Sequence, residues 1–175
     1  MPQAVNPPRT KLLSEVDFPA PIDDRYFEDY VTGAVYEYGY ITVTEAEILE
    51  FAQSYDPQPI HVDREFAAAG PFGGLIASGW HTAGVMMRML CDHYVSRVAS
   101  LASPGVDELR WATPLRPGDR LRLRTEIVEA RPSRTKPDRG LIRTRAALLN
   151  DADGQVPSLL AMNLIARRPS QEEPE

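Results

Sequence analysis

A helical repeat of apolar residues in the middle of the chain most restricts the folds available to it. From Trp80 to Val98 these residues recur with a period of 3.6, over about five helical turns. The stripe consists of Trp80, Ala83, Gly84, Met87, Leu90, Cys91, Tyr94, Val95 and Val98. We therefore predict one long helix that buries this stripe in the core.

The segments around this helix are typical of antiparallel strands. Leu121, Leu123 and Ile127 alternate with charged residues, as in a strand with one solvated face. Turn-forming residues separate the strand candidates, which are residues 34–43, 105–111, 121–127, 140–149 and 155–167. One long helix followed by an antiparallel meander predicts an α+β fold, in which the helix covers the apolar face of the sheet.

The length and composition of the chain favour a single domain. Its 175 residues are 43% hydrophobic, which is enough to fill one core. Residues 1–25 are rich in proline and predict an extended N-terminal arm, and residues 169–175 predict a frayed acidic tail. We expect the folded domain to occupy residues 26–168.

Charge and composition exclude several classes of function. The 19 Lys and Arg against 25 Asp and Glu leave a net charge of −6, which argues against nucleic-acid binding. One cysteine and three histidines without close spacing predict neither a disulfide framework nor a metal site. The first twenty residues lack a secretory signal, and the apolar run of residues 72–87 is too short and polar to span a bilayer. We therefore expect a cytoplasmic protein without a membrane partner.

The first candidate for chemistry lies where a predicted helix ends. Thr44 and Glu47 form a capping-box pattern that begins this helix, and the prolines of Asp56-Pro57-Gln58-Pro59 end it. A further helical turn is predicted over residues 62–69. Asp56 and His61 are five positions apart on the stiffened segment, and such a pair is suited to acid–base chemistry on water. Both residues could instead serve as ordinary polar residues at helix ends.

The second candidate is the glycine-bearing loop before the long helix, residues 72–79. A helix N-terminus presents free N–H groups and a positive dipole end, and Gly79 would let a substrate carbonyl approach closely. The Gly79 N–H could then stabilise an oxyanion or enolate. Alternatively, Ser78 and Gly79 form a plain turn that caps a buried helix. The surroundings of Ser78 do not match the G-x-S-x-G elbow of serine hydrolases.

Together these two stretches resemble the MaoC-like hydratases, also called R-specific enoyl-CoA hydratases. The hydratase motif of that family has Asp, any residue, Asn, Pro, an aliphatic residue and His, which reads here as Asp56-Pro-Gln-Pro-Ile-His61. The loop Phe72-Gly-Gly-Leu-Ile-Ala-Ser-Gly79 follows in the same order, and residues 111–121 look like the strand–Pro-Gly-Asp–strand segment of the family.

The resemblance implies a hotdog fold, in which an antiparallel sheet wraps around a long central helix. It implies that Asp56 and His61 activate the water that adds to a trans-2-enoyl thioester, while the Gly79 N–H stabilises the thioester oxygen. Ser78, Gly74 and Ile76 are expected to bind the substrate, and no metal or redox cofactor is needed. The resemblance also implies a homodimer, or a larger assembly of dimers, with acyl-thioester sites near the interface.

Two departures from the family pattern affect the expected substrate more than the reaction. Gln58 stands where the family usually has Asn, and Ser78 stands where many members have His. Two other functions are carried alongside the hydratase: a hotdog thioesterase that attacks the thioester carbonyl, and a non-catalytic acyl-thioester-binding protein.

Overall fold

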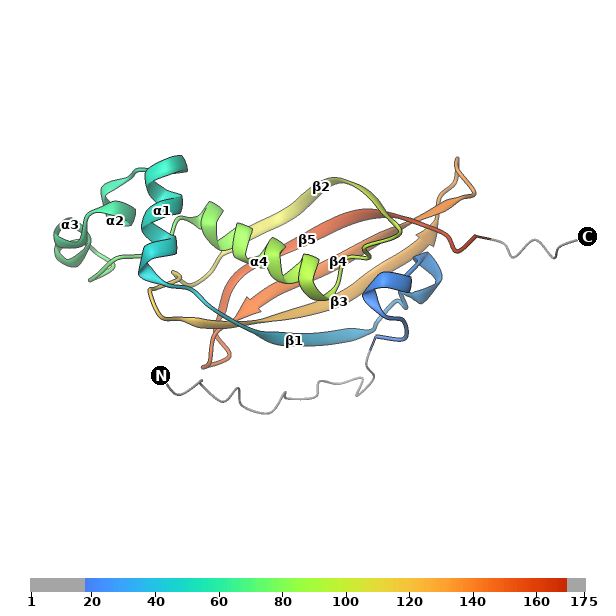
Figure 1. Cartoon of the computed structure of the whole chain (residues 1–175), viewed down its shortest axis with the longest axis horizontal. Helices are drawn as coiled ribbons and strands as arrows, with labels where there is room; N and C mark the ends of the chain where they lie inside the picture. Colours follow the sequence, from blue (N-terminus) through green and yellow to red (C-terminus); the bar gives the residue numbers. More distant parts are fainter. Residues whose placement is uncertain (1–17, 170–175) are drawn as a thin grey trace, which may run out of the picture.

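The computed structural model describes residues 18–169 as one sheet with helices on one side of it (Figure 1). Residues 1–17 of the predicted arm and 170–175 of the predicted tail lie outside the described residues. The described part of the arm packs against the domain instead of extending from it. It contains the short 3₁₀ helix Ile22–Asp24, and a second one follows at Phe27–Asp29. Ala20 and Arg25 are both buried.

Five antiparallel strands form the sheet in the order β1-β3-β4-β5-β2. They are β1 Val35–Thr42, β2 Ser100–Trp111, β3 Arg120–Pro132, β4 Arg139–Leu149 and β5 Gln155–Ala166. The predicted meander is confirmed for β3, β4 and β5 but is wrong for β2, which lies at the far edge beside β5. Because β2 and β3 are not neighbours in the sheet, the connection between them crosses the end of the sheet. Leu115 of this connection is buried in the core, where it is 1% exposed.

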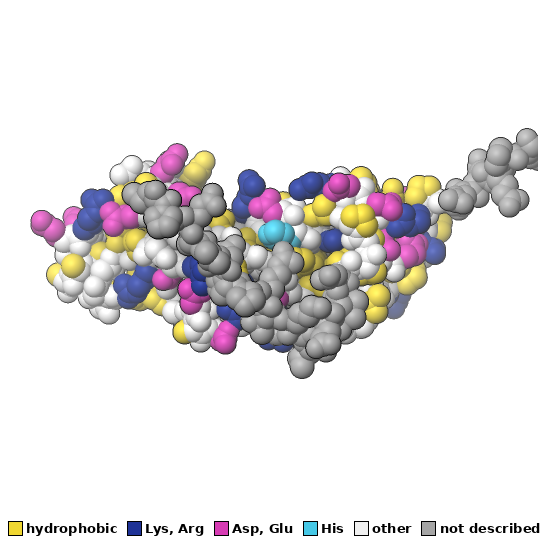
Figure 2. Space-filling view, turned by 60° about the horizontal axis from the view of Figure 1, so that its bottom comes forward, with side chains coloured by type: hydrophobic (Ala, Val, Ile, Leu, Met, Phe, Trp, Pro, Cys, Tyr) yellow, Lys and Arg dark blue, Asp and Glu magenta, His cyan; other side chains and the backbone are white. Residues whose placement is uncertain are grey.

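The alternation predicted for β3 is confirmed. Leu121, Leu123 and Ile127 are fully buried on the face that lies under the helix. The arginines of the other face form ion pairs, among them Arg120 with Asp151 and Arg122 with Glu37. Figure 2 shows Lys and Arg side chains interspersed with Asp and Glu over the visible surface. These arginines therefore lie on the polar face of the sheet, but this face is less solvated than predicted, since the side chains of Arg120 and Arg122 are only 24% and 13% exposed.

Three helices before the long one carry the first candidate stretch. They are α1 Glu45–Tyr55, α2 Pro59–Val62 and α3 Arg64–Ala69. The predicted capping box at α1 is present, with Thr44 and Glu47 bonding reciprocally. The single helical turn predicted over residues 62–69 is divided at Asp63. Its carboxylate accepts the N–H groups of Glu65 and Phe66 and so begins α3 as a separate helix.

The long helix α4 spans Gly79–His93, so it is shorter than predicted, and only part of the predicted stripe is buried: Leu90 and Tyr94 lie in the core. Trp80 and Met87 of the predicted core stripe are 62% and 49% exposed, and Cys91 is also exposed. The buried positions are Thr82, Val85, Met86, Met89 and Leu90. Apolar residues occur on two sides of this helix, and periodicity alone does not indicate which side meets the sheet.

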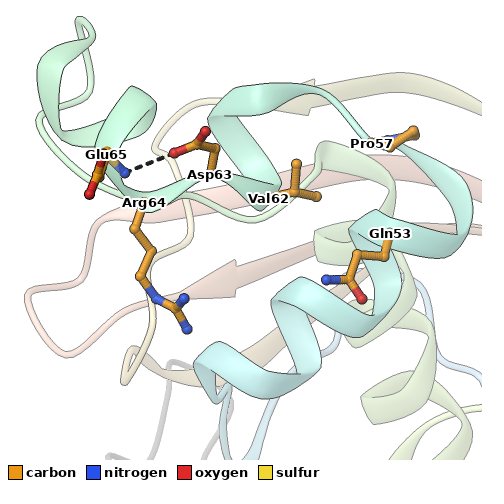
Figure 3. Close-up of a pocket in the computed structure, with 6 residues that line it drawn as sticks. All are labelled: Gln53, Pro57, Val62, Asp63, Arg64 and Glu65. Atoms are coloured by element: carbon orange, nitrogen blue, oxygen red, sulfur yellow. Dashed lines mark hydrogen bonds between the residues drawn. The ribbon is translucent and has the colours of Figure 1, made fainter.

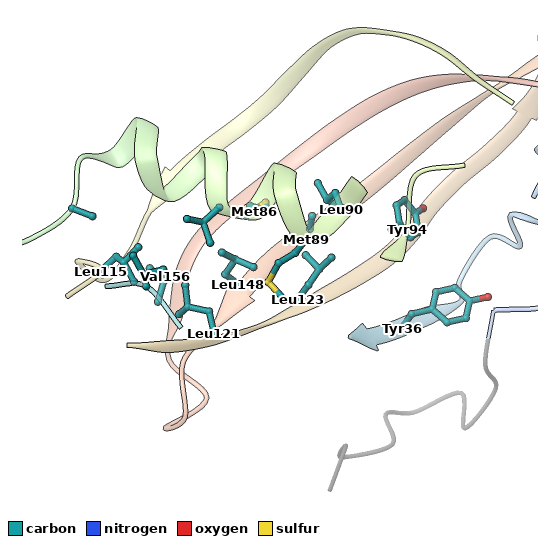
Figure 4. Close-up of a cluster of buried hydrophobic side chains, with 14 of the residues drawn as sticks. Tyr36, Met86, Met89, Leu90, Tyr94, Leu115, Leu121, Leu123, Leu148 and Val156 are labelled. Carbon is teal, nitrogen blue, oxygen red and sulfur yellow. The ribbon is translucent and has the colours of Figure 1, made fainter. Parts of the chain in front are cut away.

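The core lies between α4 and the sheet (Figure 4). Met86 and Met89 of α4 pack in one cluster with Leu121 and Leu123 of β3 and Leu148 of β4. This packing fixes α4 against the sheet, and with it the N-terminus that begins at Gly79.

Among the helices of residues 18–169, none combines the length and the apolar character needed to span a bilayer.

Candidate functional site

The end of α1 places the first two candidate side chains. Asp56 is the C-cap residue of α1, and its N–H donates to the carbonyl of Ala52 at 2.9 Å. Pro57 and Pro59 follow, and Pro59 is the first residue of α2. The chain reverses within this segment, since the His61 N–H donates to the Gln58 carbonyl at 2.8 Å. The two prolines thus hold Asp56 and His61 on one tight bend.

Asp56 and His61 converge, with 3.5 Å between Asp56 Oδ2 and His61 Nε2. His61 is 5% exposed, and its Nδ1 lies 2.9 Å from the carbonyl oxygen of Ile76. Because a carbonyl oxygen can only accept, Nδ1 carries a proton and donates. In the neutral imidazole, the lone pair of Nε2 therefore faces the carboxylate of Asp56.

Two donors fix the Asp56 carboxylate. The Ser78 hydroxyl donates to Oδ2 at 2.6 Å, and the Gln58 amide donates to Oδ1 at 2.7 Å. These hydrogen bonds, first that of Ser78 and then that of Gln58, hold the pKa of Asp56 below its ordinary value of 3.8. Asp56 is thus an ionised acceptor at neutral pH.

Ser78 connects this pair to the N-terminus of α4. It is fully buried, and as the N-cap residue it accepts the Trp80 N–H at 3.2 Å while donating to Asp56. Gly79 is the first residue of α4, so its N–H has no partner within the helix. The second candidate stretch therefore lies directly beside the first. The proposed plain capping turn is present, but the same serine also contacts the carboxylate.

One cavity of about 380 Å³ joins Asp56, His61 and Gly79. Of the three predicted substrate-binding residues, Ile76 lines this cavity. Ser78 lies behind Asp56, and Gly74 lies outside the lining, where a side chain would be 3.5 Å from Arg116. The remaining lining residues are Gln58, Phe72, Ala77, Trp80, Thr82, Trp111, Ala112, Thr113, Pro114 and Leu115.

Two contributors to the site are missed or only partly predicted from the sequence. The departure at Gln58 predicts an altered hydrogen bond that positions the loop or the water, and in the structure the Gln58 amide donates directly to Asp56. Trp111 was treated as part of a strand, yet it lines the cavity from the end of β2. The short separation of Gln58 from Asp56 was a usable signal. No local signal pointed to Trp111, which reaches Gly79 across 32 residues.

A second, larger cavity of about 690 Å³ lies between α1 and the α2–α3 segment (Figure 3). Its lining includes Gln53, Asp63 and Arg64. The Asp63 carboxylate caps α3, and the Arg64 guanidinium pairs with Glu45 of α1. These charged groups are thus engaged in holding the helices together, which makes this cavity a weaker candidate for chemistry.

No metal centre was predicted for this chain. Within residues 18–169, no three His, Cys, Asp or Glu side chains gather closely enough to hold a metal ion.

His81 lies on α4 beside the site and packs against α1. Its ring stacks on Phe51, with centroids 4.9 Å apart and 10° between the planes, and its Nδ1 is buried without a hydrogen-bond partner in the described chain. Burial lowers the pKa of His81 from its ordinary value of 6.5, although Glu47 of α1 opposes this shift. The helix that carries Asp56 is therefore packed against an imidazole that resists protonation.

Replacing His81 with Phe is expected to flatten the pH dependence of stability. Because the pKa of His81 is lowered in the folded state, the unfolded chain binds the proton first as pH falls through about 6.5. The wild-type free energy of unfolding should then decrease from pH 7.5 to pH 5 more steeply than that of His81→Phe. Urea unfolding at several pH values measures both slopes, and equal slopes would contradict the assignment.

Comparisons with known proteins identify a matching family and several relatives. Residues 30–146 match the profile of the MaoC-like domain family. The chain is 37% identical over 91 residues to the 3-hydroxyacyl-thioester dehydratase Z of Mycobacterium tuberculosis, covering 51% of this chain and 60% of that protein. It is 32% identical over 116 residues to the 3-hydroxybutyryl-CoA dehydratase of Methylorubrum extorquens, covering 63% of this chain and 69% of that protein.

Solved structures show the same fold. A MaoC-like dehydratase from Rhodospirillum rubrum superposes with a TM-score of 0.77 at 36% identity, covering 83% of this chain and 99% of that one. A Mycobacterium tuberculosis protein with a double hotdog fold superposes with a TM-score of 0.69 at 21% identity, covering 86% of this chain and 46% of that one. The predicted hotdog arrangement of sheet and helix is thus confirmed.

Proposed function

This chain belongs to the MaoC-like domain family, and on that premise we propose that it is a hydratase or dehydratase of acyl thioesters. In the hydration direction it would add water to a trans-2-enoyl-CoA, or a related thioester, to form an (R)-3-hydroxyacyl thioester. One observation carries this proposal: Asp56 and His61 lie 3.5 Å apart in a cavity that Gly79 also lines. Homologues named as dehydratases support the same class of reaction.

In the proposed mechanism, Asp56 and His61 hold one water molecule between them. The ionised Asp56 and the Nε2 lone pair of His61 are both acceptors, and a water molecule has two protons to donate. As the water oxygen bonds to C3 of the enoyl group, Nε2 takes one of these protons. The Asp56 carboxylate keeps the other O–H oriented and stabilises the imidazolium that forms. The His61 imidazolium then delivers its Nε2 proton to C2, so water is added without a net change in the enzyme.

The N-terminus of α4 supplies the complementary charge. Attack at C3 moves the electrons of the double bond toward the thioester carbonyl, whose oxygen gains enolate character. In the proposed complex this oxygen faces the Gly79 N–H and the positive end of the helix dipole. Ile76 would contact the acyl group from the cavity wall. The atoms balance without a metal ion or redox cofactor, so we propose that none takes part.

A thioester panel tests this function. The purified protein is incubated with short, medium and branched trans-2-enoyl thioesters of CoA, pantetheine and a carrier protein, while the absorbance of the conjugated enone is followed. Loss of that absorbance with formation of the 3-hydroxyacyl product is expected. Free-thiol release from acyl-CoA would instead indicate a thioesterase. Binding without any turnover would indicate a non-catalytic module, and either result would reject the hydratase.

We also propose that two copies pair through their β2 edges. β2 is an edge strand, and apolar side chains are exposed on it and on the neighbouring side of α4. These exposed residues are Trp80, Met87, Leu101, Val106 and Trp111. An edge strand exposes unpaired backbone groups, and this one also exposes apolar side chains. Pairing with the same strand of a second copy would bury both. Because Trp111 and Trp80 also line the cavity, the pairing would place the site near the dimer interface.

Replacing Val106 with Lys is expected to convert this dimer to a monomer at micromolar concentration. Val106 is 51% exposed in the middle of β2, and two lysines facing each other across a dimer axis repel and cost desolvation. Sedimentation equilibrium measures the mass. Val31→Lys is the matched control, since Val31 is 55% exposed outside the sheet. A wild-type protein that sediments as a monomer would contradict the proposal.

A further inference from the structure

Trp111 directly contacts Gly79, the residue that supplies the proposed oxyanion donor. Its indole N–H donates to the carbonyl oxygen of Gly79 at 2.7 Å, from a position 32 residues away in sequence. A Cβ atom built on Gly79 would lie only 2.7 Å from Cε2 of Trp111 and 2.9 Å from its Nε1. The indole is therefore packed directly on the glycine backbone, and only glycine fits beneath it.

This contact compensates for a weakness of glycine. Glycine at the start of a helix lets the chain adopt many backbone angles, and it loses more conformational freedom on folding than other residues do. An N–H that is to stabilise an oxyanion must instead have one fixed direction. The Gly79 carbonyl that accepts from Trp111 belongs to the same residue as that N–H, so confining one restricts the other.

The strand that carries Trp111 is itself well anchored. Trp111 pairs with Pro157 of β5, and the next N–H, that of Ala112, donates to the carbonyl of Val156 at 2.9 Å. Trp80 adds an edge contact to the indole, with ring centroids 5.6 Å apart and 76° between the planes. The sheet thus holds the indole in place over the first turn of α4.

We propose that Trp111 is a positioning residue for the reaction: its indole N–H fixes the Gly79 backbone so that the Gly79 N–H points at the thioester oxygen. The effect is on the transition state more than on substrate binding, because the developing enolate depends on this donor more than the neutral carbonyl does. This inference rests on the proposed function, and it adds to it a residue outside the acid–base pair.

Trp111→Phe and Trp111→Tyr test the inference, since both keep an aromatic ring and lose the indole N–H. Loss of one neutral hydrogen bond predicts that kcat falls about fivefold. KM should stay within about twofold, because the bound ground state changes little. Tyr40→Phe, which removes a hydroxyl from a β1 ring outside the cavity, is the control and should leave kcat unchanged.

A spectroscopic readout separates positioning from general loss of structure. A cinnamoyl-CoA thioester absorbs at longer wavelength when its carbonyl is polarised by a hydrogen-bond donor. The wild-type protein should shift this absorbance on binding, and both Trp111 variants should shift it less at saturating ligand. Variants with the wild-type kcat and the wild-type shift would overturn the inference while leaving the hydratase intact. A wild-type protein that neither turns over enoyl thioesters nor shifts the chromophore would overturn both.

Discussion

Replacing Asp56 with Asn is expected to lower kcat by at least about 10²-fold, with a similar loss for His61→Asn. The Asn side chain has nearly the shape of Asp but lacks its charge, so it neither orients the attacking water as strongly nor stabilises a protonated His61. In His61→Asn the lone pair of Nε2 that takes the proton is missing. Loss of enone absorbance from the best thioester of the panel measures both rates.

The double variant gives a sharper test than either single one. Asp56 and His61 act on the same water molecule, so the second substitution should cost little once the first has been made. Asp138→Asn is a matched control on an exposed turn, where the Asp138 carboxylate accepts hydrogen bonds from Arg139. Melting temperatures near that of the wild type would show that the variants fold. Rates within about threefold of the wild type in either single variant would rule out the proposed proton transfer.

Replacing Arg25 with Met is expected to destabilise the domain by about 3 kcal/mol and to lower its melting temperature by about 10 °C. Arg25 is 4% exposed, and its guanidinium donates to the carbonyls of Ala20, His93 and Tyr94. Its cationic head also lies 3.6 Å from the centroid of the Phe18 ring. Without the guanidinium, the carbonyls of Ala20, His93 and Tyr94 each lose a donor, that of Tyr94 keeping the Tyr30 hydroxyl, and the C-terminus of α4 loses its cation.

Differential scanning calorimetry measures this loss. Arg97→Met is the matched control, because Arg97 is an exposed arginine that pairs with Asp23 at 3.6 Å and has Asp92 as a further charged neighbour. Such a surface ion pair contributes less than about 1 kcal/mol to the free energy of unfolding, so the control should melt near the wild-type temperature. A similar melting temperature for both variants would show that residues 18–25 contribute nothing to the end of α4.

The local signals that were reliable all act over a few neighbouring residues. Thr44 and Glu47 begin α1 because each side chain satisfies a free N–H of the other, and the prolines after Asp56 end it because they have no N–H to donate. Period-two alternation placed Leu121 and Leu123 on the buried face of β3. No long-range packing was needed to predict these features. The bend that carries Asp56 and His61 also follows from two closely spaced prolines, but the side chains are held in place by Ser78 and by the Ile76 carbonyl from a later segment.

The features that were missed or wrong depend on contacts between distant segments. A meander predicts β2 beside β3, but β2 pairs with β5 at the far edge of the sheet, and Leu115 of the connection to β3 is buried in the core. The predicted α4 stripe is only partly right, because apolar residues that meet the sheet, such as Leu90, and apolar residues left exposed, such as Trp80 and Met87, have the same period. Trp111 contacts Gly79 from a position 32 residues away in sequence, through the placement of β2 beside the start of α4. Hydrogen bonding along the chain is local, whereas the choice of a buried face depends on what the rest of the chain places opposite it.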